Sequence, residues 1–419
     1  MTTRQIPIVP VSLDAAKRVD SGHVNASIKG HKGERGVIRL TALPPLSIYV
    51  HVPWCVRKCP YCDFNSHAAP DSLPEDLYLD ALAADLEQVL PDVWGRQVFS
   101  VFIGGGTPSL LSERALDRLL SLLRTYLNLW PDAEITLEAN PGTVESNKFQ
   151  SFAASGVNRI SLGIQSFDDV KLKALGRIHD HRQALRAIDL SMRAVSRVNL
   201  DLMYGLPGQT VKESEQDVMR ALSFGTDHLS LYQLTLEPST VFAKYPPVLT
   251  DEDTLGEMEQ MVVDLSAQAG FERYEVSAYA KPGQQCRHNR NYWEFGDYLG
   301  VGPGAHAKLS FPDRIERHAK LRNPESWMQA SLKRDQSHLA EKRVVGASDL
   351  PFEFMLNALR LQQGVPTHFF QDRTGLSIAM IHQQIQRAVS QGLLAADPTR
   401  LVATPHGWHF LNDLQEIFL

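Results

Sequence analysis

Cysteine is scarce in this chain, with four residues among 419. Small domains that depend on disulfides contain far more, so a disulfide framework is excluded. No apolar run approaches the roughly 20 residues that a membrane-spanning helix needs. Positive charge is not in excess: 42 Lys and Arg stand against 48 Asp and Glu, a net charge of −6. This balance argues against a general affinity for nucleic acid.

The first 20 residues also lack the features of a targeting peptide. They carry charges at Arg4, Asp14, Lys17, Arg18 and Asp20 and contain no apolar signal-type segment. Acidic residues in this region disfavour a mitochondrial transit peptide as well. Glycines and scattered charges continue without a sustained period, so we expect residues 1–44 to be a flexible extension. Few cysteines and no targeting segment predict a cytoplasmic protein.

Three of the four cysteines lie within eight residues, at Cys55, Cys59 and Cys62 in the sequence CVRKCPYC. Structural zinc takes four ligands, and an iron–sulfur cubane is normally held by four thiolates. Three thiolates with no fourth nearby therefore indicate a [4Fe-4S] cluster with one iron left for a ligand that is not protein. A zinc site completed by Cys286 or by a distant histidine is the alternative.

Short β-like runs alternate with stretches of helical period from residue 46 to about 236. The predicted strands cover residues 47–52, 98–103, 134–139, 159–164, 198–203 and 228–234. The clearest helical stretches are 77–90 and 115–127, with leucines at helical spacing. This alternation predicts an α/β fold whose parallel sheet is open or curled into an incomplete barrel.

Polar residues stand where several of these strands end. The second strand is followed by the glycine run GGGTP at 104–108, which allows a ligand to approach the backbone or simply forms a tight turn. Glu138, Gln165 and Asp201 end the next three strands. One such residue is often a satisfied core group, but three at corresponding ends predict a binding site facing the cysteines.

Residues 346–419 form a separate block with a predicted helix-turn-helix over 369–392 and a β-wing over 393–405. Such a shape is typical of DNA-binding modules. The block nevertheless contains six acidic residues against four arginines, which disfavours a surface that follows phosphates. We expect a lid or docking module over the barrel mouth instead.

Several longer motifs resemble a known family. They are Tyr49-x-His51-x-Pro53-x-Cys55, CPYCDFNS at 59–66, GGGTP, EANP, GIQSF, DLMYGLPGQT, HNRNYW at 288–293 and GVGPGAH at 300–306. Together they resemble the oxygen-independent coproporphyrinogen III oxidase-like branch of the radical S-adenosylmethionine (SAM) superfamily, and within it the HemW-type heme chaperones. The resemblance covers residue 46 to the C-terminus. It implies a partial (β/α)6 barrel over 45–245, a family-specific α/β extension over 246–345 and a mainly helical, winged-helix-like domain over 346–419.

The resemblance also implies roles for individual residues. Cys55, Cys59 and Cys62 would hold the cluster. The implied SAM contacts are Tyr49, Gly105, Gly106, Thr107, Glu138, Gln165, Arg177 and Asp201, with mostly backbone contacts at Thr235 and His306. His288 is put forward as a heme ligand, with a structural histidine as the alternative. Cys286 is either a thiolate ligand or an inert buried thiol.

One departure directs the functional prediction. The true oxidase has a further cysteine two residues after the third, and this chain has Phe64 there. The resemblance therefore implies a heme chaperone that binds [4Fe-4S], SAM and heme, is capable in principle of reductive SAM cleavage, and delivers heme to apo-haemoproteins such as a membrane-associated respiratory protein. The alternatives are an oxygen-independent coproporphyrinogen III oxidase or another radical SAM enzyme of porphyrin metabolism. A zinc-bound structural protein would leave the polar strand ends unexplained.

Overall fold

The computed structural model describes residues 37–143 and 147–419. It contains a sheet of twelve strands in the order β14-β13-β12-β11-β1-β4-β5-β6-β7-β8-β10-β9. Within these residues, no helix combines the length and apolar character required to span a bilayer.

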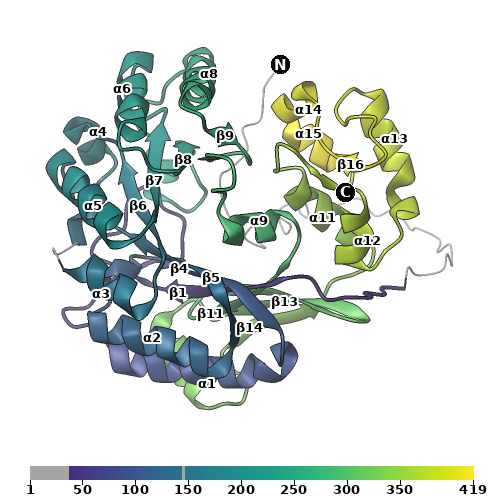
Figure 1. The fold of residues 1–419 in the computed structure, drawn as a ribbon, viewed down its shortest axis with the longest axis horizontal. Helices are drawn as coiled ribbons and strands as arrows, with labels where there is room; N and C mark the ends of the chain where they lie inside the picture. The colour runs from purple at the N-terminus through teal and green to yellow at the C-terminus, as the bar shows by residue number, and fades with distance from the viewer. Residues whose placement is uncertain (1–36, 144–146) are drawn as a thin grey trace.

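The six predicted strands form the curved centre of this sheet. They are β1 (Leu46–Val52), β4 (Gln97–Gly105), β5 (Asn128–Ala139), β6 (Arg159–Gln165), β7 (Arg197–Tyr204) and β8 (His228–Gln233). Each pairs with the next in parallel. Figure 1 shows the strands and their helices as an arc that is open on one side. The predicted α/β fold with an incomplete barrel is confirmed.

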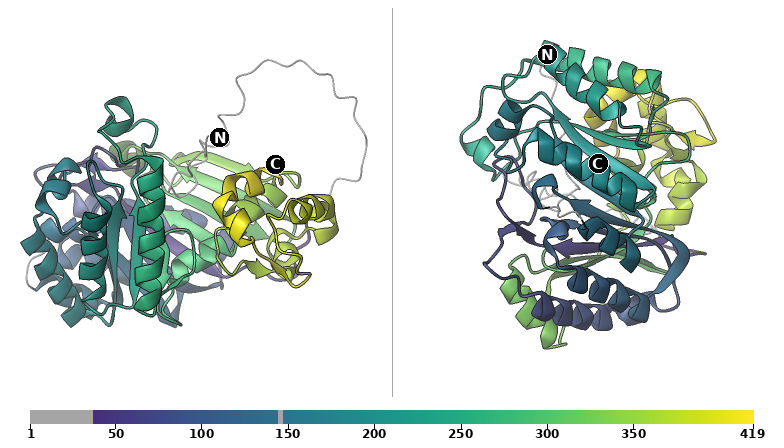
Figure 2. Two further views of the ribbon diagram at one scale, coloured as in Figure 1. Left: turned by 90° about the horizontal axis from the view of Figure 1, so that it is seen from above. Right: turned by 60° about the vertical axis from the view of Figure 1, so that its left-hand side comes forward.

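Helices cover the outside of the arc. They are α1 (Glu75–Val93), α2 (Glu113–Tyr126), α3 (Lys148–Ser155), α4 (Asp169–Ala174), α5 (His181–Ala194), α6 (Val211–Leu222) and α8 (Glu252–Gln268). The views in Figure 2 show this outer layer from two further sides. Alternation within the strands explains the arrangement: in β1, Ile48, Val50 and Val52 are fully buried in the main hydrophobic core. The intervening side chains therefore point to the inner face of the barrel.

The second half of the chain lengthens the sheet at both ends. β9 (Glu272–Arg273) and β10 (Ala278–Ala280) add antiparallel strands beside β8. β11 (Asp297–Val301) pairs in parallel with β1, and β12 (His306–Phe311), β13 (Arg314–Lys320) and β14 (Leu339–Val344) follow it antiparallel. Helix α9 (Arg287–Trp293) packs against β1, β4 and β11, and α10 (Pro324–Leu332) packs against α1.

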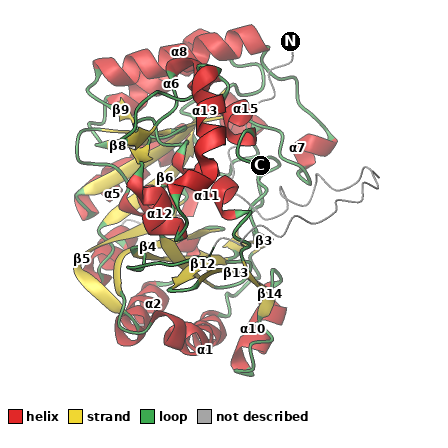
Figure 3. Cartoon of the chain, turned by 90° about the vertical axis from the view of Figure 1, so that its right-hand side faces the viewer, coloured by secondary structure: helices red, strands yellow, loops and turns green. Residues whose placement is uncertain are grey.

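The C-terminal block is mainly helical (Figure 3). It contains α11 (Leu350–Ala358), α12 (His368–Thr374), α13 (His382–Ser390), α14 (Pro405–His409) and α15 (Leu411–Glu416), with the short strands β15 (Val365–Pro366) and β16 (Arg400–Leu401). α12 ends at Gly375, which has a left-handed φ of +71° that glycine adopts without strain. α12 and α13 occupy the residues predicted for the helix-turn-helix, and a bridge between Leu394 and Ala403 lies in the predicted wing.

The position of this block differs from our expectation of a lid over the barrel mouth. α11 contacts α9, and Leu361 forms a bridge with Glu275 beside the end strands β9 and β10. The block therefore lies at the open side of the arc, next to α9 (Figure 1). The sequence pattern of the block contains no information on which surface it covers.

The structure also differs from the expected flexible extension in residues 37–44, the last eight residues of that segment. Residues 1–36 lie outside the described part of the chain. Within residues 37–44, Ile38 and Leu40 are buried in the hydrophobic core of the C-terminal block. Arg39 N donates to Gly375 O at 3.1 Å, and Leu40 N donates to Pro312 O at 2.9 Å. Burial of these two apolar side chains holds the segment in place. No periodicity in the sequence predicts this burial.

Candidate metal and cofactor site

The cysteine loop follows the carboxyl end of β1. Cys55 closes the short strand β2 (Trp54–Cys55), which pairs in parallel with β3 (His67–Ala68). His67 N donates to Pro53 O and Ala69 N donates to Cys55 O, each at 2.8 Å, so the two ends of the loop are tied together. Cys55, Cys59 and Cys62 are free, partly exposed thiols within this loop.

Three thiolates on one loop are the donor set expected for a [4Fe-4S] cubane, in which each thiolate binds a different iron. Burial raises the pKa of Cys55, and raises that of Cys62 to about 11. Cluster assembly must therefore release protons from this loop. The loop therefore fits a three-thiolate cluster with one iron left for a ligand that is not protein.

The glycine run lies directly against the cysteine loop. Gly106 N donates to Val52 O, and Thr107 N donates to Trp54 O, both at 2.7 Å. A Cβ on Gly106 would lie 2.5 Å from Trp54 O, so a side chain is excluded there. Thr107 Oγ1 is 3.5 Å from Cys55 Sγ. The structure thus brings Gly105, Gly106 and Thr107 beside the cysteines, as predicted, and close packing alone accounts for Gly106.

Glu138 and Asp201 form a pair of buried carboxyl groups on the inner face of the barrel. Burial and the neighbouring Asp201 raise the pKa of Glu138 to about 8, and its Oε2 accepts a 3.1 Å hydrogen bond from Gly105 N. Burial also raises the pKa of Asp201, which accepts from Asn199 Nδ2 at 2.7 Å and Ser161 Oγ at 3.0 Å. Two carboxyl groups held this way would gain from a cationic group bound between the strand ends.

Arg177 and Gln165 meet over Gly163 at the end of β6. Arg177 Nη2 donates to Gly163 O at 2.8 Å, and its Nη1 lies 3.6 Å from Cys59 Sγ. The buried Nε of Arg177 has no partner among the described residues. Gln165 has a φ of +69°, which is strained for a residue with a side chain. The glycine leaves room for both, since an added Cβ would lie 3.1 Å from Gln165 Nε2 and 3.3 Å from Arg177 Nη2.

His51 is a site residue that sequence analysis did not single out. Its Nε2 donates to Asn65 O at 2.8 Å, and its Nδ1 accepts from Tyr49 OH at 3.1 Å. Burial lowers the pKa of His51 to about 4, so the ring is neutral. Asn65 Nδ2 in turn donates to Pro303 O and Arg322 O, at 3.0 and 2.9 Å. The Tyr49-x-His51 spacing, which places both rings on one face of β1, was the available signal.

Thr235 and His306 lie at the edge of the same site. Thr235 follows β8, and its Oγ1 donates to Glu237 Oε1 at 2.7 Å. His306 opens β12, and its charge would further lower the pKa of His51. Both residues therefore lie on the cysteine side of the barrel.

His288 is not part of this group. It lies on α9, is buried, and packs its ring 5.1 Å from that of Phe102. Its Nδ1 is 3.3 Å from Ser100 Oγ, near the start of β4, and burial lowers the pKa of His288 to about 4. Cys286 Sγ donates to Glu134 Oε1 at 3.3 Å, and burial raises the pKa of this thiol to about 12. A protonated, bonded thiol fits the inert interpretation of Cys286.

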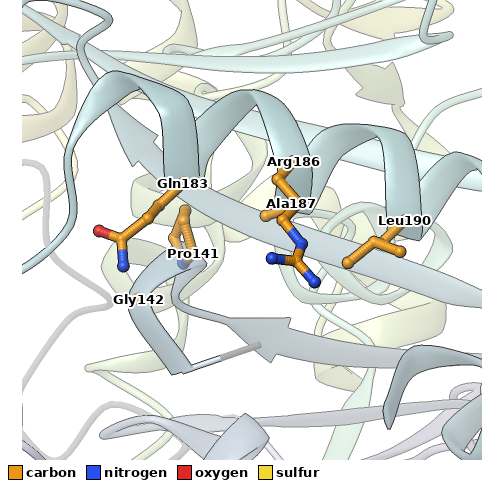
Figure 4. A pocket seen from close by; sticks show the side chains of 6 residues that line it. All are labelled: Pro141, Gly142, Gln183, Arg186, Ala187 and Leu190. Atoms are coloured by element: carbon orange, nitrogen blue, oxygen red, sulfur yellow. The ribbon is translucent and has the colours of Figure 1, made fainter. Parts of the chain in front are cut away.

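A small surface pocket of about 90 Å³ lies elsewhere, between Pro141 and Gly142 and the face of α5 that carries Gln183, Arg186, Ala187 and Leu190 (Figure 4). Pockets that hold nucleotide-sized ligands have volumes of about 300 Å³ or more. This pocket is therefore not the predicted cofactor site.

Comparison with known proteins agrees with the motifs. Residues 49–221 match the model of the radical SAM superfamily, and residues 347–410 match that of the HemN C-terminal domain. Heme chaperone HemW of Escherichia coli is 49% identical over 382 residues, which span 91% of this chain and 100% of the relative. Heme chaperone HemW of Haemophilus influenzae is 46% identical, with 90% and 98% covered. A mouse relative, radical S-adenosyl methionine domain-containing protein 1, mitochondrial, is 36% identical, with 88% and 86% covered.

The fold is also similar to a solved structure, the coproporphyrinogen III oxidase HemN of Escherichia coli. The TM-score is 0.76 at 22% identity, with 90% of each chain covered. At this identity the likeness concerns the fold alone. The long matches at higher identity decide the family: the chain belongs to the HemW heme chaperone family of the radical SAM superfamily.

Proposed function

We propose that this protein is a cytoplasmic heme chaperone that binds a [4Fe-4S] cluster, SAM and heme, and delivers heme to apo-haemoproteins. The observation that carries the proposal is the end-to-end similarity to Heme chaperone HemW, at 49% identity over the full length of that relative. The acceptor that we propose is a membrane-associated respiratory haemoprotein.

The cluster and SAM would share the mouth of the barrel. Cys55, Cys59 and Cys62 would hold three irons, and the cluster supplies an electron and an open iron position when bound. The paired carboxyl groups of Glu138 and Asp201 suit the positive charges of SAM, and the unpaired Nε of Arg177 suits its carboxylate. Tyr49, Gln165, Thr235 and His306 complete the proposed lining.

An oxygen-independent coproporphyrinogen III oxidase is the second candidate. It is favoured only by the shared fold of the solved oxidase. The position of the additional oxidase cysteine is occupied by Phe64, whose side chain is exposed and offers no ligand. This absence of a fourth thiol in the loop weighs against the oxidase.

His288 is the proposed axial ligand of heme. In the structure its ring packs on Phe102 and Ser100, so ligation requires α9 to shift away from the barrel wall. A purely structural role requires no such change. If His288 ligates heme, its substitution should abolish this ligation. If its role is structural, heme binding should persist.

The test is an anaerobic hemin titration of the reconstituted protein. Wild type should take up hemin stoichiometrically, and His288→Ala should lose the axial-ligand absorption. His318→Ala is a matched control, since His318 is also buried but bonds to Glu316 on β13. Heme taken up by wild type should then pass to an apo-cytochrome. Turnover of coproporphyrinogen III without hemin uptake would instead establish the oxidase.

A further inference from the structure

The contact between the C-terminal block and α9 contains a buried arginine that is poorly paired. Arg360 follows α11 and is 7% exposed. Its guanidinium lies over the indole ring of Trp293, 4.4 Å from the ring centre. Trp293 is the last residue of α9 and ends the HNRNYW sequence. The guanidinium of this cation–π contact thus comes from the C-terminal block, and the indole comes from α9.

Both partners retain an N–H donor without an acceptor. Neither Arg360 Nε nor Trp293 Nε1 finds a hydrogen-bond partner within the described residues, and both atoms are buried. Buried donors of native proteins are nearly always satisfied, so an unpaired one calls for an explanation. Two such donors in one contact indicate that an acceptor belongs there.

The carboxylate that reaches Arg360 does not fill this need. Glu275 Oε2 lies 3.8 Å from Arg360 Nη2, which is too long for a hydrogen bond. Burial raises the pKa of Glu275 and lowers that of Arg360, because both charged groups are removed from water.

A second arginine in the same interface shows what a satisfied guanidinium looks like here. Arg317 donates to Glu353 Oε2 from Nη2 at 2.8 Å and from Nε at 3.1 Å, and to Tyr298 OH at 2.6 Å. Two of its N–H groups thus converge on one carboxylate oxygen, and another reaches a hydroxyl. Arg360 lacks the equivalent partner.

The region around Arg360 continues toward the cofactor site. Tyr232 interacts electrostatically with Arg360 and also with Asp201 and Glu138 on the inner face of the barrel. Tyr232 therefore connects the surroundings of Arg360 with the carboxyl groups at the strand ends.

Backbone bonds hold Arg360 in place. Leu361 bridges to Glu275, and Gln362 N donates to Tyr274 O at 3.0 Å. The guanidinium is thus presented by a fixed segment, which lowers the entropy lost when it binds a ligand.

We propose that Arg360 and Trp293 form a carboxylate-binding subsite that takes a propionate group of the tetrapyrrole. This inference rests on the proposed heme-carrying function and assigns a recognition element to it. The guanidinium supplies charge and a planar set of donors, and the indole adds an N–H and an aromatic surface for the macrocycle. Trp293 is partly exposed, so the subsite has a route to solvent.

The test compares hemin with hemin dimethyl ester, whose propionates carry no charge. Wild-type protein should bind hemin about 10-fold or more tightly than the ester, as expected for one charge-assisted hydrogen bond. Arg360→Gln should bind the two ligands with similar affinity. Arg360→Lys keeps the charge without the fork and should retain only part of the preference.

Arg317→Lys is the matched control, because it alters an interface arginine that already has its partners, and it should leave the preference unchanged. Equal binding of acid and ester by wild type would overturn the subsite while leaving heme binding intact. A full preference in both Arg360 variants would also overturn it, since another group would then read the propionates. Binding of neither ligand would remove the proposed function itself.

Discussion

Arg177 and Cys59 are in contact, with 3.6 Å between Nη1 and Sγ, although 118 residues separate them in the sequence. The side chain that the motifs associate with SAM thus also touches a proposed cluster ligand. Its remaining donor, Nε, is buried and unpaired within the described residues. One guanidinium is therefore positioned to influence both the cluster and the ligand on it.

Substitution of Arg177 by Gln should weaken SAM binding by about 10-fold or more, since one charge-assisted interaction is lost. The three cysteines remain, so cluster assembly should persist. Equilibrium SAM binding to the reconstituted protein and the spectrum of its reduced cluster measure both effects. Arg182→Gln, on the exposed face of α5, should match wild type. Unchanged SAM affinity in Arg177→Gln would contradict the assigned contact.

Replacement of Cys55, Cys59 and Cys62 by Ala should abolish the cluster absorbance after anaerobic reconstitution. Cys286→Ala should retain it, because Cys286 is bonded to Glu134 away from the loop. Iron and sulfide analysis provides the measurement. Stoichiometric zinc in place of iron in wild type would show that the loop binds a different metal.

Two glycines should respond to alanine in opposite directions. Gly106→Ala places a Cβ against the backbone of Trp54, so it should lower the free energy of unfolding by about 1–3 kcal/mol and impair cluster retention. Gly256→Ala, within α8 and with open space around it, should raise that free energy by about 0.5–1 kcal/mol. Denaturant titrations of the cluster-free proteins compare the two. Normal stability of Gly106→Ala would show that the loop can move aside.

Glu138 should make stability depend on pH. The pKa of Glu138 is about 8 in the folded protein and near 4.5 when unfolded, so folding takes up a proton between these values. The contribution of Glu138 to stability should therefore fall as pH rises from about 5 to 8. Glu138→Gln cannot ionise and should gain stability relative to wild type across this window.

Melting temperatures of cluster-free protein at pH 5.5, 6.5 and 7.5 provide the test for Glu138. Glu257→Gln, at an exposed position of α8, should show the wild-type slope. Identical slopes for Glu138→Gln and wild type would mean that Glu138 is ionised in the folded protein.

The central strands were predictable because their signal is local. Alternation in β1 puts Ile48 and Val50 into the core and Tyr49 and His51 on the opposite face, and the remaining parallel strands follow similar rules. The proximity of the glycine run to Cys55 was also predictable, because carboxyl ends of parallel strands gather at one edge.

The contacts that complete the site were not predictable in this way. Asn65 reaches Pro303 and Arg322 across more than 200 residues, and Arg177 reaches Cys59 from the segment between α4 and α5. Such pairs depend on how the sheet curves and on where the second half of the chain docks. Neither the curvature of the sheet nor this docking produces a periodic pattern in the sequence. The burial of Ile38 produces none either.

The pairing of β11 with β1 and of β10 with β8 has a consequence for access to the interior. For the barrel to close, the outer edges of β1 and β8 would have to meet. Both edges are already hydrogen-bonded, that of β1 to β11 and that of β8 to β10. The opening is therefore permanent, and its width is set by the sheet rather than by a loop. A ligand that enters the interior through this side has to pass α9 and the C-terminal block, which lie there.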